Sequence, residues 1–445
     1  MSRMRVHGIL VIYHHYLMPN ASMLMEHVNA FQKCSRFKVW IVNVELGFPR
    51  ALEDLEFDVI ILHYSLFAWL PFYLDEVFET YLAECTSSYK IAFFQDEYRF
   101  WPERAALLNR YQVDCVYTCL EPTHFAATYQ RFTRVPKLFQ YLPGYISEEM
   151  VRLGRHYTTP DAQRPIDIGY RGRQADFSMG KGAQEKHVIG VRFRELAAHL
   201  SLQLDIETDE SKRIYGADWL AFLANCRAVL GVEAGVSIFD IDNVVLPRCR
   251  QLLAENPHMT FEEMYDTLLV HYEDQGVYYR TVSPRVFEAA AVRACQILFE
   301  GKYSGVLEPM VHYIPLQKDF GNFDEVIQLY YNAALRRELT ENAYRDLIAS
   351  GHYSYRRFIA DFDQQLLALG LSPAIDPADT MAVTWRLTSH RMHRTLQIKL
   401  KQADGRFRHR FRQKNHQLIQ SLARSQSPTL RRLKASVRFV KHYWQ

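Results

Sequence analysis

The sequence has no apolar segment close to the roughly 20 residues that a helix needs to cross a bilayer. Its first apolar run, Ile9–Tyr13, is short and is followed at once by His14 and His15, so it lacks the form of an export signal. The seven cysteines are odd in number and lack the regular spacing of a disulfide framework. Cys115 and Cys119 form a C-x3-C pair, but there is no second pair to complete a zinc site. These absences predict a cytoplasmic protein with reduced thiols.

A strong net charge is lacking as well, because the 445 residues carry a formal charge of only +3. The whole chain therefore gives no reason to expect a nucleic acid partner. A hydrophobic content of 48% and a charged content of 23% are globular values, and the chain is too long for one hydrophobic core. Two domains of ordinary size are expected.

The first 150 residues predict strands that alternate with helices. The expected strands are the apolar runs 6–13, 38–44, 58–62, 89–94, 114–117 and 138–141. This alternation is typical of a parallel sheet that helices cover on both faces. Ligands bind such sheets at the carboxyl ends of the strands, so the polar residues that follow three of these strands are candidate site residues. They are His14, His15, His63, Tyr64, Gln95, Asp96 and Glu97.

The second half of the chain repeats this architecture without repeating the sequence. After a linker at about 147–165, strands are expected at 166–170, 202–206, 228–232, 296–299 and 312–316, with an inserted helical pair at about 244–282. The predicted fold class is therefore α/β, with Rossmann-like domains at 1–150 and 151–370 and a tail at 371–445.

The tail is basic and amphipathic. Beyond Asp379 its only acidic residue is Asp404, and apolar residues punctuate the series of Arg, Lys and His. Two interpretations stand side by side: attachment to an anionic membrane surface, or a solvated basic tail that packs on a partner.

The stretch 283–316 organises the second domain. Ser283 is expected to cap a helix that Pro284 opens, and Arg285 and Glu288 share a face of that helix because they lie three residues apart. The sequence SPRVFEAAA, with the later FEGKYSG and HYIPL, resembles the donor-domain signature of GT-B glycosyltransferases. It is most similar to the spore-maturation-protein-like branch related to the retaining family 4.

This resemblance implies a GT-B fold, in which two Rossmann-like domains face a cleft, the acceptor domain first and the nucleotide-sugar domain second, here with a basic helical C-terminal extension. It implies transfer of a sugar from a nucleotide-diphosphate sugar to a glycan, lipid-linked or other acceptor. Neither a metal nor another cofactor is expected, and retention of the anomeric configuration is favoured. A cytoplasmic enzyme of cell-surface polysaccharide biosynthesis, peripheral at the inner membrane face, fits these expectations.

Cations are expected to hold the donor diphosphate. Without a metal, Arg, Lys and helix N-termini must stabilise the charge that grows on the leaving group. The resemblance assigns this work to Arg173 and Lys186, which follow the first strand of the second domain. Arg171 and Lys181 compete for these roles, because the gap between Arg and Lys is longer than in the family pattern.

Further donor contacts come from the signature stretch. Glu288 matches the glutamate that binds the ribose hydroxyls in the family, and Arg285 is either its ion-pair partner or a phosphate ligand. Ser304 and Gly305 are expected to give amides to donor oxygens.

One position departs from the family pattern. A second glutamate, which contacts the donor sugar, normally stands shortly before the ribose-binding one, and Arg280 occupies that position here. Either Glu233 in the turn GVEAGVS takes this role or the sugar is held differently. In the first domain, Asp96 and His63 stand where related enzymes place polar groups that face the sugars, and a carboxylate there would be the general base if the reaction inverts.

Two alternatives to transfer stay open. Arg280 and the basic tail motivate a catalytically silent nucleotide-sugar-binding scaffold. A GT-B-fold sugar epimerase would need acidic groups for cleavage and re-addition.

Overall fold

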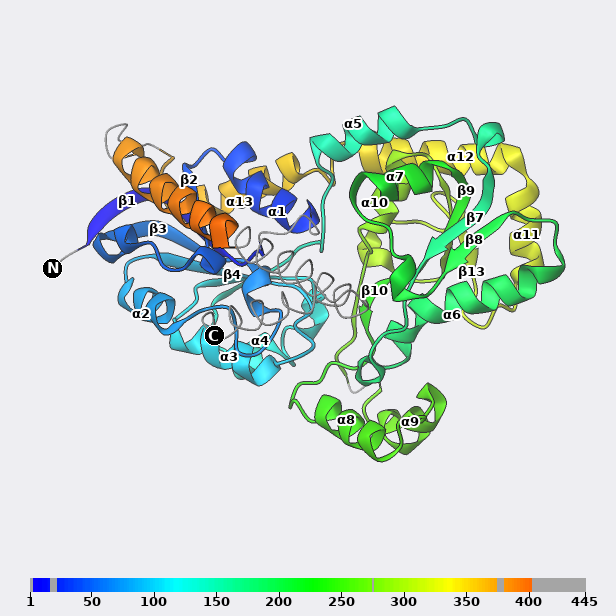
Figure 1. Ribbon diagram of the computed structural model, residues 1–445, viewed down its shortest axis with the longest axis horizontal. Helices are drawn as coiled ribbons and strands as arrows, with labels where there is room; N and C mark the ends of the chain where they lie inside the picture. The colour runs from blue at the N-terminus through cyan, green and yellow to red at the C-terminus, as the bar shows by residue number, and fades with distance from the viewer. Residues whose placement is uncertain (1–2, 17–21, 274–275, 374–379, 402–445) are drawn as a thin grey trace, which may run out of the picture. The chain divides into compact units, whose positions relative to one another are not determined.

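The computed structural model describes residues 3–16, 22–273, 276–373 and 380–401. The chain divides into two compact units, 1–381 and 382–445. The first unit holds two Rossmann-like domains, each built on a parallel sheet (Figure 1). The predicted α/β class with two such domains, which is the GT-B architecture, is confirmed.

The first domain has a sheet of strand order β2-β1-β3-β4-β5-β6, in which all neighbours are parallel. Strands β1 to β5 are buried along most of their length because helices cover both faces, which explains the apolar runs within them. The strands are β1 Met4–Tyr13, β2 Val39–Asn43, β3 Leu55–Leu62, β4 Tyr89–Phe94, β5 Cys115–Thr118 and β6 Lys137–Gln140. The helices include α1 Ser22–Cys34, α2 Glu76–Glu84, α3 Trp101–Arg110 and α4 Tyr129–Phe132.

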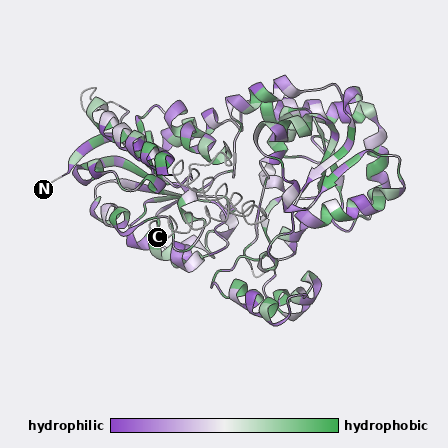
Figure 2. Cartoon of the chain, viewed as in Figure 1, coloured by the Kyte–Doolittle hydropathy of each residue, from purple (hydrophilic) through white to green (hydrophobic). Residues whose placement is uncertain are grey.

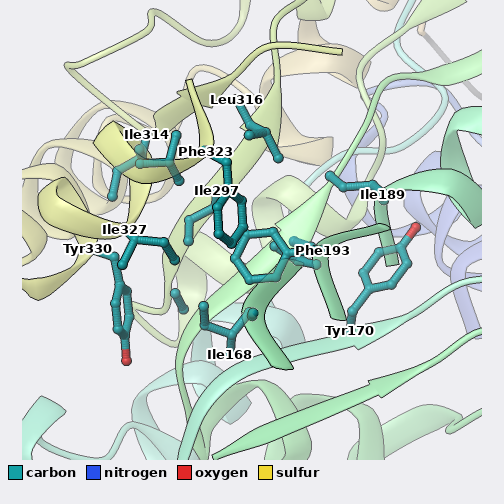
Figure 3. Close-up of a cluster of buried hydrophobic side chains, with 14 of the residues drawn as sticks. Ile168, Tyr170, Ile189, Phe193, Ile297, Ile314, Leu316, Phe323, Ile327 and Tyr330 are labelled. Atoms are coloured by element: carbon teal, nitrogen blue, oxygen red, sulfur yellow. The ribbon is translucent and has the colours of Figure 1, made fainter. Parts of the chain in front are cut away.

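The second domain has a parallel five-stranded sheet of order β13-β12-β9-β7-β8. The strands are β7 Ile166–Arg171, β8 Leu204–Glu207, β9 Cys226–Gly231, β12 Cys295–Phe299 and β13 Ile314–Leu316. The helices are α5 Glu148–Tyr157, α6 Lys181–Leu196, α7 Gly216–Ala224, α10 Arg285–Ala291, α11 Phe323–Tyr331 and α12 Ala333–Ala343. In the main core, Ile189 and Phe193 of α6 and Ile327 of α11 join Ile168 and Ile297 of the sheet (Figure 3). A second core packs α7 and α10 against the sheet.

The insertion between β9 and α10 is closed by a short strand pair. β10 Ala234–Val236 and β11 Tyr279–Thr281 pair antiparallel, and α8 Val245–Glu255 and α9 Phe261–Thr267 lie between them in sequence. The predicted helical pair is therefore present, but the last residues of the predicted segment form a strand.

The last long helix of the predicted second domain, α13 Tyr355–Ala368, packs against α1 of the first domain. The Asp363 carboxylate accepts from the Ser35 hydroxyl at 2.8 Å and from the Arg36 amide at 2.6 Å. The chain thus crosses between the domains twice.

The predicted cap of α10 is wrong. The helix begins at Arg285, and no side chain caps it. Instead, the carbonyl oxygens of Ser283 and Pro284 accept from the amides of Val286 and Phe287 at 3.0 Å each. The Ser283 side chain is therefore free of a capping role.

The second unit is described only as far as residue 401, and residues 380–401 form one helix. Figure 2 shows hydrophobic and hydrophilic residues mixed along it. Residues 402–445, which hold most of the predicted basic tail, lie outside the described residues. Across the described part of the chain, none of the helices combines the length and the apolarity that a bilayer span requires.

Candidate active site

A cavity of about 230 Å³ opens at the carboxyl edge of the second sheet. We call it the second-domain cavity. Four cationic side chains line it, and among the described residues no carboxylate does. The cations are Arg173, Lys186, Arg213 and Arg285. Such a site favours an anion with several oxygens, since arginine forks match phosphate geometry.

The turn after β7 positions two of these cations. Tyr170 donates its hydroxyl to the carbonyl oxygen of Lys186 at 2.7 Å, which ties α6 to the strand. A Cβ on Gly172 would stand 2.4 Å from that same carbonyl oxygen, so only glycine allows the approach. The close approach of Gly172 to the Lys186 backbone thus places the side chains of Arg173 and Lys186 in the lining of the same cavity.

Burial lowers the pKa of Lys186 to about 8 from its ordinary 10.5. The carboxylate of Asp96 opposes this shift, while Arg285, Arg280 and Arg173 add to it. The ammonium is therefore costly in the empty cavity. A bound anion would offset this cost, because it stabilises the charged form of all the nearby cations.

Glu288 lies beside the second-domain cavity and contacts Trp219, which lines it. Trp219 donates its indole N–H to the carboxylate at 2.6 Å, and the Arg285 guanidinium lies 5.0 Å from the centre of the Trp219 ring. Burial raises the pKa of Glu288, and the Trp219 hydrogen bond and Arg285 oppose the shift. Arg285 and Glu288 thus both contact Trp219, and whether they form an ion pair or divide the donor contacts stays a prediction. Arg285 also donates to the carbonyl oxygen of Arg171.

Of the cations that compete in the sequence, Arg173 and Lys186 line the cavity and the other two are engaged elsewhere. Arg171 is buried, pairs with Asp205 at 2.8 Å and lies over the Phe222 ring at 4.3 Å. Lys181 lies 3.7 Å from the ring centre of Tyr265 in the insertion.

Ser304 and Gly305, the two loop residues predicted to give amides to the donor, make hydrogen bonds within the second domain. The Ser304 hydroxyl accepts from the Val282 amide at 3.1 Å and lies 2.9 Å from the Thr281 hydroxyl. The Gly305 amide donates to the Lys302 carbonyl oxygen at 2.9 Å. Their roles toward a donor stay a prediction.

Glu233 and Arg280 are neighbours in a buried ion cluster. The pairing of β10 with β11 brings them together, with the Arg280 Nε 3.5 Å from a Glu233 oxygen. Arg280 also pairs with Glu185, and the Tyr303 amide donates to Glu233 at 2.9 Å. Neither side chain lines the two cavities described here. Arg280, which departs from the family pattern, is therefore paired with Glu233, the residue that one of the two alternatives assigns to the donor sugar.

A second cavity of about 950 Å³ lies between the two Rossmann-like domains, and we call it the interdomain cavity. The first domain contributes residues from the ends of β1, β3 and β4, and the second contributes Arg173, Ala175, Asp176 and Met179. Arg173 lines both cavities, so they meet at its side chain. A ligand that extends from one into the other would pass this guanidinium.

Asp96 presents its carboxylate to the interdomain cavity from a left-handed backbone position, with φ of 56°. Its amide donates to the Tyr279 hydroxyl at 3.2 Å, and that hydroxyl donates to Glu97 at 2.9 Å. Glu97 is buried and also accepts from Thr118 and Tyr129. Burial raises the pKa of Glu97, and the hydrogen bond from Thr118 opposes this. One hydroxyl from the second domain thus fixes the loop that carries Asp96.

His63 is fully buried and lies behind Ser65, which lines the interdomain cavity. The Ser65 amide donates to His63 Nδ1 at 3.2 Å, so Nε2 carries the ring proton and donates to His27 Nδ1 at 2.9 Å. Burial holds the pKa of His63 well below its ordinary value and lowers that of His27 to about 3. Both rings are therefore neutral at physiological pH. The catalytic role predicted for His63 would have to act through Ser65.

Aromatic side chains line the outer part of the interdomain cavity. His14 stacks on Tyr73 at 3.7 Å between ring centres, and Tyr16 meets His14 edge-on at 4.5 Å. Trp69 and Tyr16 are both more than half exposed. Apolar ring faces with polar edges suit a ligand that is itself amphipathic.

Three site residues escaped the sequence analysis. Trp219 lies near the start of α7 and was assigned no role from the sequence. Tyr279 donates a hydrogen bond to Glu97, which lies 182 residues earlier in the sequence. Arg104, which lines the interdomain cavity, donates to the carbonyl oxygen of Phe67, 37 residues earlier. No local pattern signals contacts of that length.

No known protein family matches the sequence, and no curated protein does so either. Solved structures are similar to this chain at low sequence identity. An alpha-glucosyltransferase in complex with UDP and a 13-mer DNA that contains an HMU base is 10% identical, with 82% of this chain and 100% of that chain covered and a TM-score of 0.46. HepE from Anabaena, in complex with UDP and glucose, is 9% identical, with 82% and 99% covered and a TM-score of 0.41. Sucrose-phosphate synthase from Thermosynechococcus elongatus is 11% identical, with 82% and 99% covered and a TM-score of 0.44. At these values we infer the chemistry of this chain from its own residues alone.

Proposed function

We propose that the protein is a glycosyltransferase that moves a sugar from a nucleotide-diphosphate sugar to a hydroxyl of an acceptor. The observation that carries this proposal is the second-domain cavity, which has four cations and, among the described residues, no carboxylate. It lies at the carboxyl edge of a Rossmann-like sheet, where nucleotides bind, and it meets a larger cavity at Arg173.

In the proposed mechanism the diphosphate lies against Arg173 and Lys186. The bond from the anomeric carbon to the phosphate oxygen breaks, and negative charge grows on that oxygen. Positively charged side chains that are already in place stabilise this charge without reorganising. Glu288 accepts hydrogen bonds from the ribose hydroxyls of the donor. Arg285 and Trp219 line the cavity between Glu288 and the two cations that hold the diphosphate.

The acceptor occupies the interdomain cavity. Its hydroxyl forms the new bond to the anomeric carbon, and its proton passes to the departing phosphate oxygen if the configuration is retained. If the configuration inverts, Asp96 takes the proton as general base. The anomeric configuration of the product decides between these routes. A glycan or lipid-linked acceptor, used on the cytoplasmic side in cell-surface polysaccharide synthesis, is part of this proposal.

The test is calorimetric titration of UDP, GDP and ADP, followed by turnover of the matching nucleotide sugars. Arg173→Met should weaken binding of the preferred nucleotide about 10- to 100-fold, since a hydrogen-bonded charge is lost. The matched control is Arg192→Met on α6, because Arg192 pairs with Glu195 at the surface and lines neither cavity. Equal affinity in the two variants would overturn the proposal.

The second candidate is a protein that binds a nucleotide sugar without transferring it. The pairing of Glu233 with Arg280 favours it, because this leaves the expected sugar-binding carboxylate neutralised and outside both cavities. Tight nucleotide binding with no release of nucleotide from any nucleotide sugar would support this candidate. Acceptor-independent hydrolysis that Asp96→Asn abolishes would exclude it.

A further inference from the structure

Ring side chains of the first domain line the outer part of the interdomain cavity, and we call four of them the aromatic rim. They are His14, Tyr16, Trp69 and Tyr73. His14 is buried, and both tyrosines pack on its ring, Tyr73 stacked at 3.7 Å and Tyr16 edge-on at 4.5 Å between ring centres. The two tyrosine hydroxyls lie 3.1 Å apart. Three of the four rings therefore form one packed surface.

Tyr16 and Trp69 present their rings to solvent, with 55% and 57% of their surface exposed. Large apolar side chains that gather at the mouth of a cavity mark a binding surface. The face of an aromatic ring is weakly negative and attracts C–H groups. A pyranose ring presents C–H groups on its faces and carries hydroxyls around its edge. Such a sugar can cover an exposed ring of the rim while its hydroxyls stay available for hydrogen bonds.

Ser65 lines the same cavity, and its hydroxyl can only accept a hydrogen bond from a ligand. The hydroxyl oxygen accepts from the His14 amide at 3.0 Å, which joins Ser65 to the rim. Because His63 Nδ1 carries no proton, the Ser65 hydroxyl donates its own proton to that nitrogen at 2.8 Å. One lone pair is left for a ligand. It suits a sugar hydroxyl, which can donate, and not a carboxylate or a phosphate.

The aromatic rim offers no charge to a ligand. Burial lowers the pKa of His14 and of His15, so both rings are neutral at pH 7. Of the described residues up to Tyr73 that line the cavity, none is Arg, Lys, Asp or Glu. Arg99 and Arg104 also line the cavity, but their guanidinium groups donate to protein oxygens. A lipid diphosphate or an acidic sugar would therefore find no cation at the rim.

We propose that the acceptor is an uncharged glycan whose sugar rings stack on Tyr16 and Trp69, with a sugar hydroxyl donating to Ser65. This inference rests on the proposed function and narrows its acceptor, because the neutral rim matches neither a lipid diphosphate nor an acidic glycan. The reacting hydroxyl of the glycan lies by Asp96, which lines the same cavity. Tyr16 and Trp69 thus determine specificity and take no part in the chemical step.

The test is calorimetric titration of the full chain with uncharged tetrasaccharides of glucose, galactose, mannose and N-acetylglucosamine, and with tetragalacturonate as the acidic probe. Wild type should bind at least one uncharged tetrasaccharide more tightly than tetragalacturonate. Tyr16→Ala and Trp69→Ala should each weaken this binding about tenfold, and Trp69→Phe should keep most of it because a ring remains. Ser65→Ala should weaken it about fivefold. The matched control is Tyr331→Ala, which removes a 50% exposed tyrosine of α11 that lines neither cavity.

Nucleotide binding separates this inference from the proposed function. Tyr16 and Trp69 do not line the second-domain cavity, so their alanine variants should bind the preferred nucleoside diphosphate as wild type does. Nucleotide binding without binding of any uncharged tetrasaccharide would overturn the glycan acceptor and leave the proposed function standing. Tighter binding of tetragalacturonate, or unchanged glycan binding by both alanine variants, would also overturn it. Glycan binding without nucleotide binding would overturn the proposed function and, with it, the acceptor role of the glycan.

Discussion

Replacing Lys186 by methionine should stabilise the empty protein and weaken nucleotide binding at the same time. The folded protein lowers the pKa of Lys186 to about 8, against an ordinary 10.5, which corresponds to about 3 kcal/mol of penalty on the ammonium form at pH 7. Water reaches the partly exposed side chain and reduces this penalty to about 1–2 kcal/mol. The free energy of unfolding of Lys186→Met should rise by that amount.

The dependence on pH gives the sharper assay. Below pH 8 the lysine is charged in both the folded and unfolded states, so the full penalty is present. Between pH 8 and 10.5 the unfolded chain holds the proton more tightly than the folded chain, so wild-type stability should approach that of the variant. Urea unfolding at pH 7 and 10 measures the difference.

Nucleotide affinity should move in the opposite direction. Calorimetry at pH 7 should show an affinity for the preferred nucleoside diphosphate about 10- to 100-fold weaker in Lys186→Met than in wild type. The wild-type affinity should also fall as the pH rises through 8, and that of the variant should not. A variant that is less stable at pH 7, or that binds nucleotide as wild type does, would refute the account of this cavity.

Three further variants test neighbouring parts of the site. Glu288→Gln should weaken nucleoside diphosphate binding about tenfold in calorimetry. Because burial raises the Glu288 pKa, wild type should lose stability as the pH rises above about 4.5, and urea unfolding of the variant should not show this loss. Tyr279→Phe should cost about 1–3 kcal/mol in urea unfolding and lower turnover, with nucleotide affinity unchanged, since it strips a hydrogen bond from buried Glu97. Gly172→Ala should cost about 1–3 kcal/mol and weaken nucleotide binding, because its Cβ would meet the Lys186 carbonyl oxygen at 2.4 Å.

The sequence was a sound guide to the fold because buried parallel strands leave a local signal. A strand covered on both faces needs a continuous apolar run, and β1, β3 and β4 each contain one. Arg173 was placed through the family resemblance, and its position after β7 puts it at the edge of the sheet where ligands bind. The same resemblance placed Lys186, and the close approach at Gly172 explains why that lysine reaches the cavity.

Contacts between segments that are distant along the chain could not be predicted from local sequence patterns. Glu233 and Arg280 meet only because the insertion between them is closed by β10 and β11, so a glutamate that looked available is paired. His63 follows a strand as expected, yet its ring turns inward to His27. The Ser283 cap was predicted wrongly for a local reason. The backbone carbonyl oxygens of Ser283 and Pro284 accept the hydrogen bonds from the first helical amides that the Ser283 hydroxyl was expected to accept.

The most direct test of the central claim is a crystal structure of the protein with the nucleoside diphosphate that binds best. The diphosphate should lie within hydrogen-bond distance of Arg173 and Lys186, with the ribose hydroxyls at Glu288. A nucleotide whose phosphates lie at Arg171 or Lys181 instead, or one bound outside the second-domain cavity, would contradict the account.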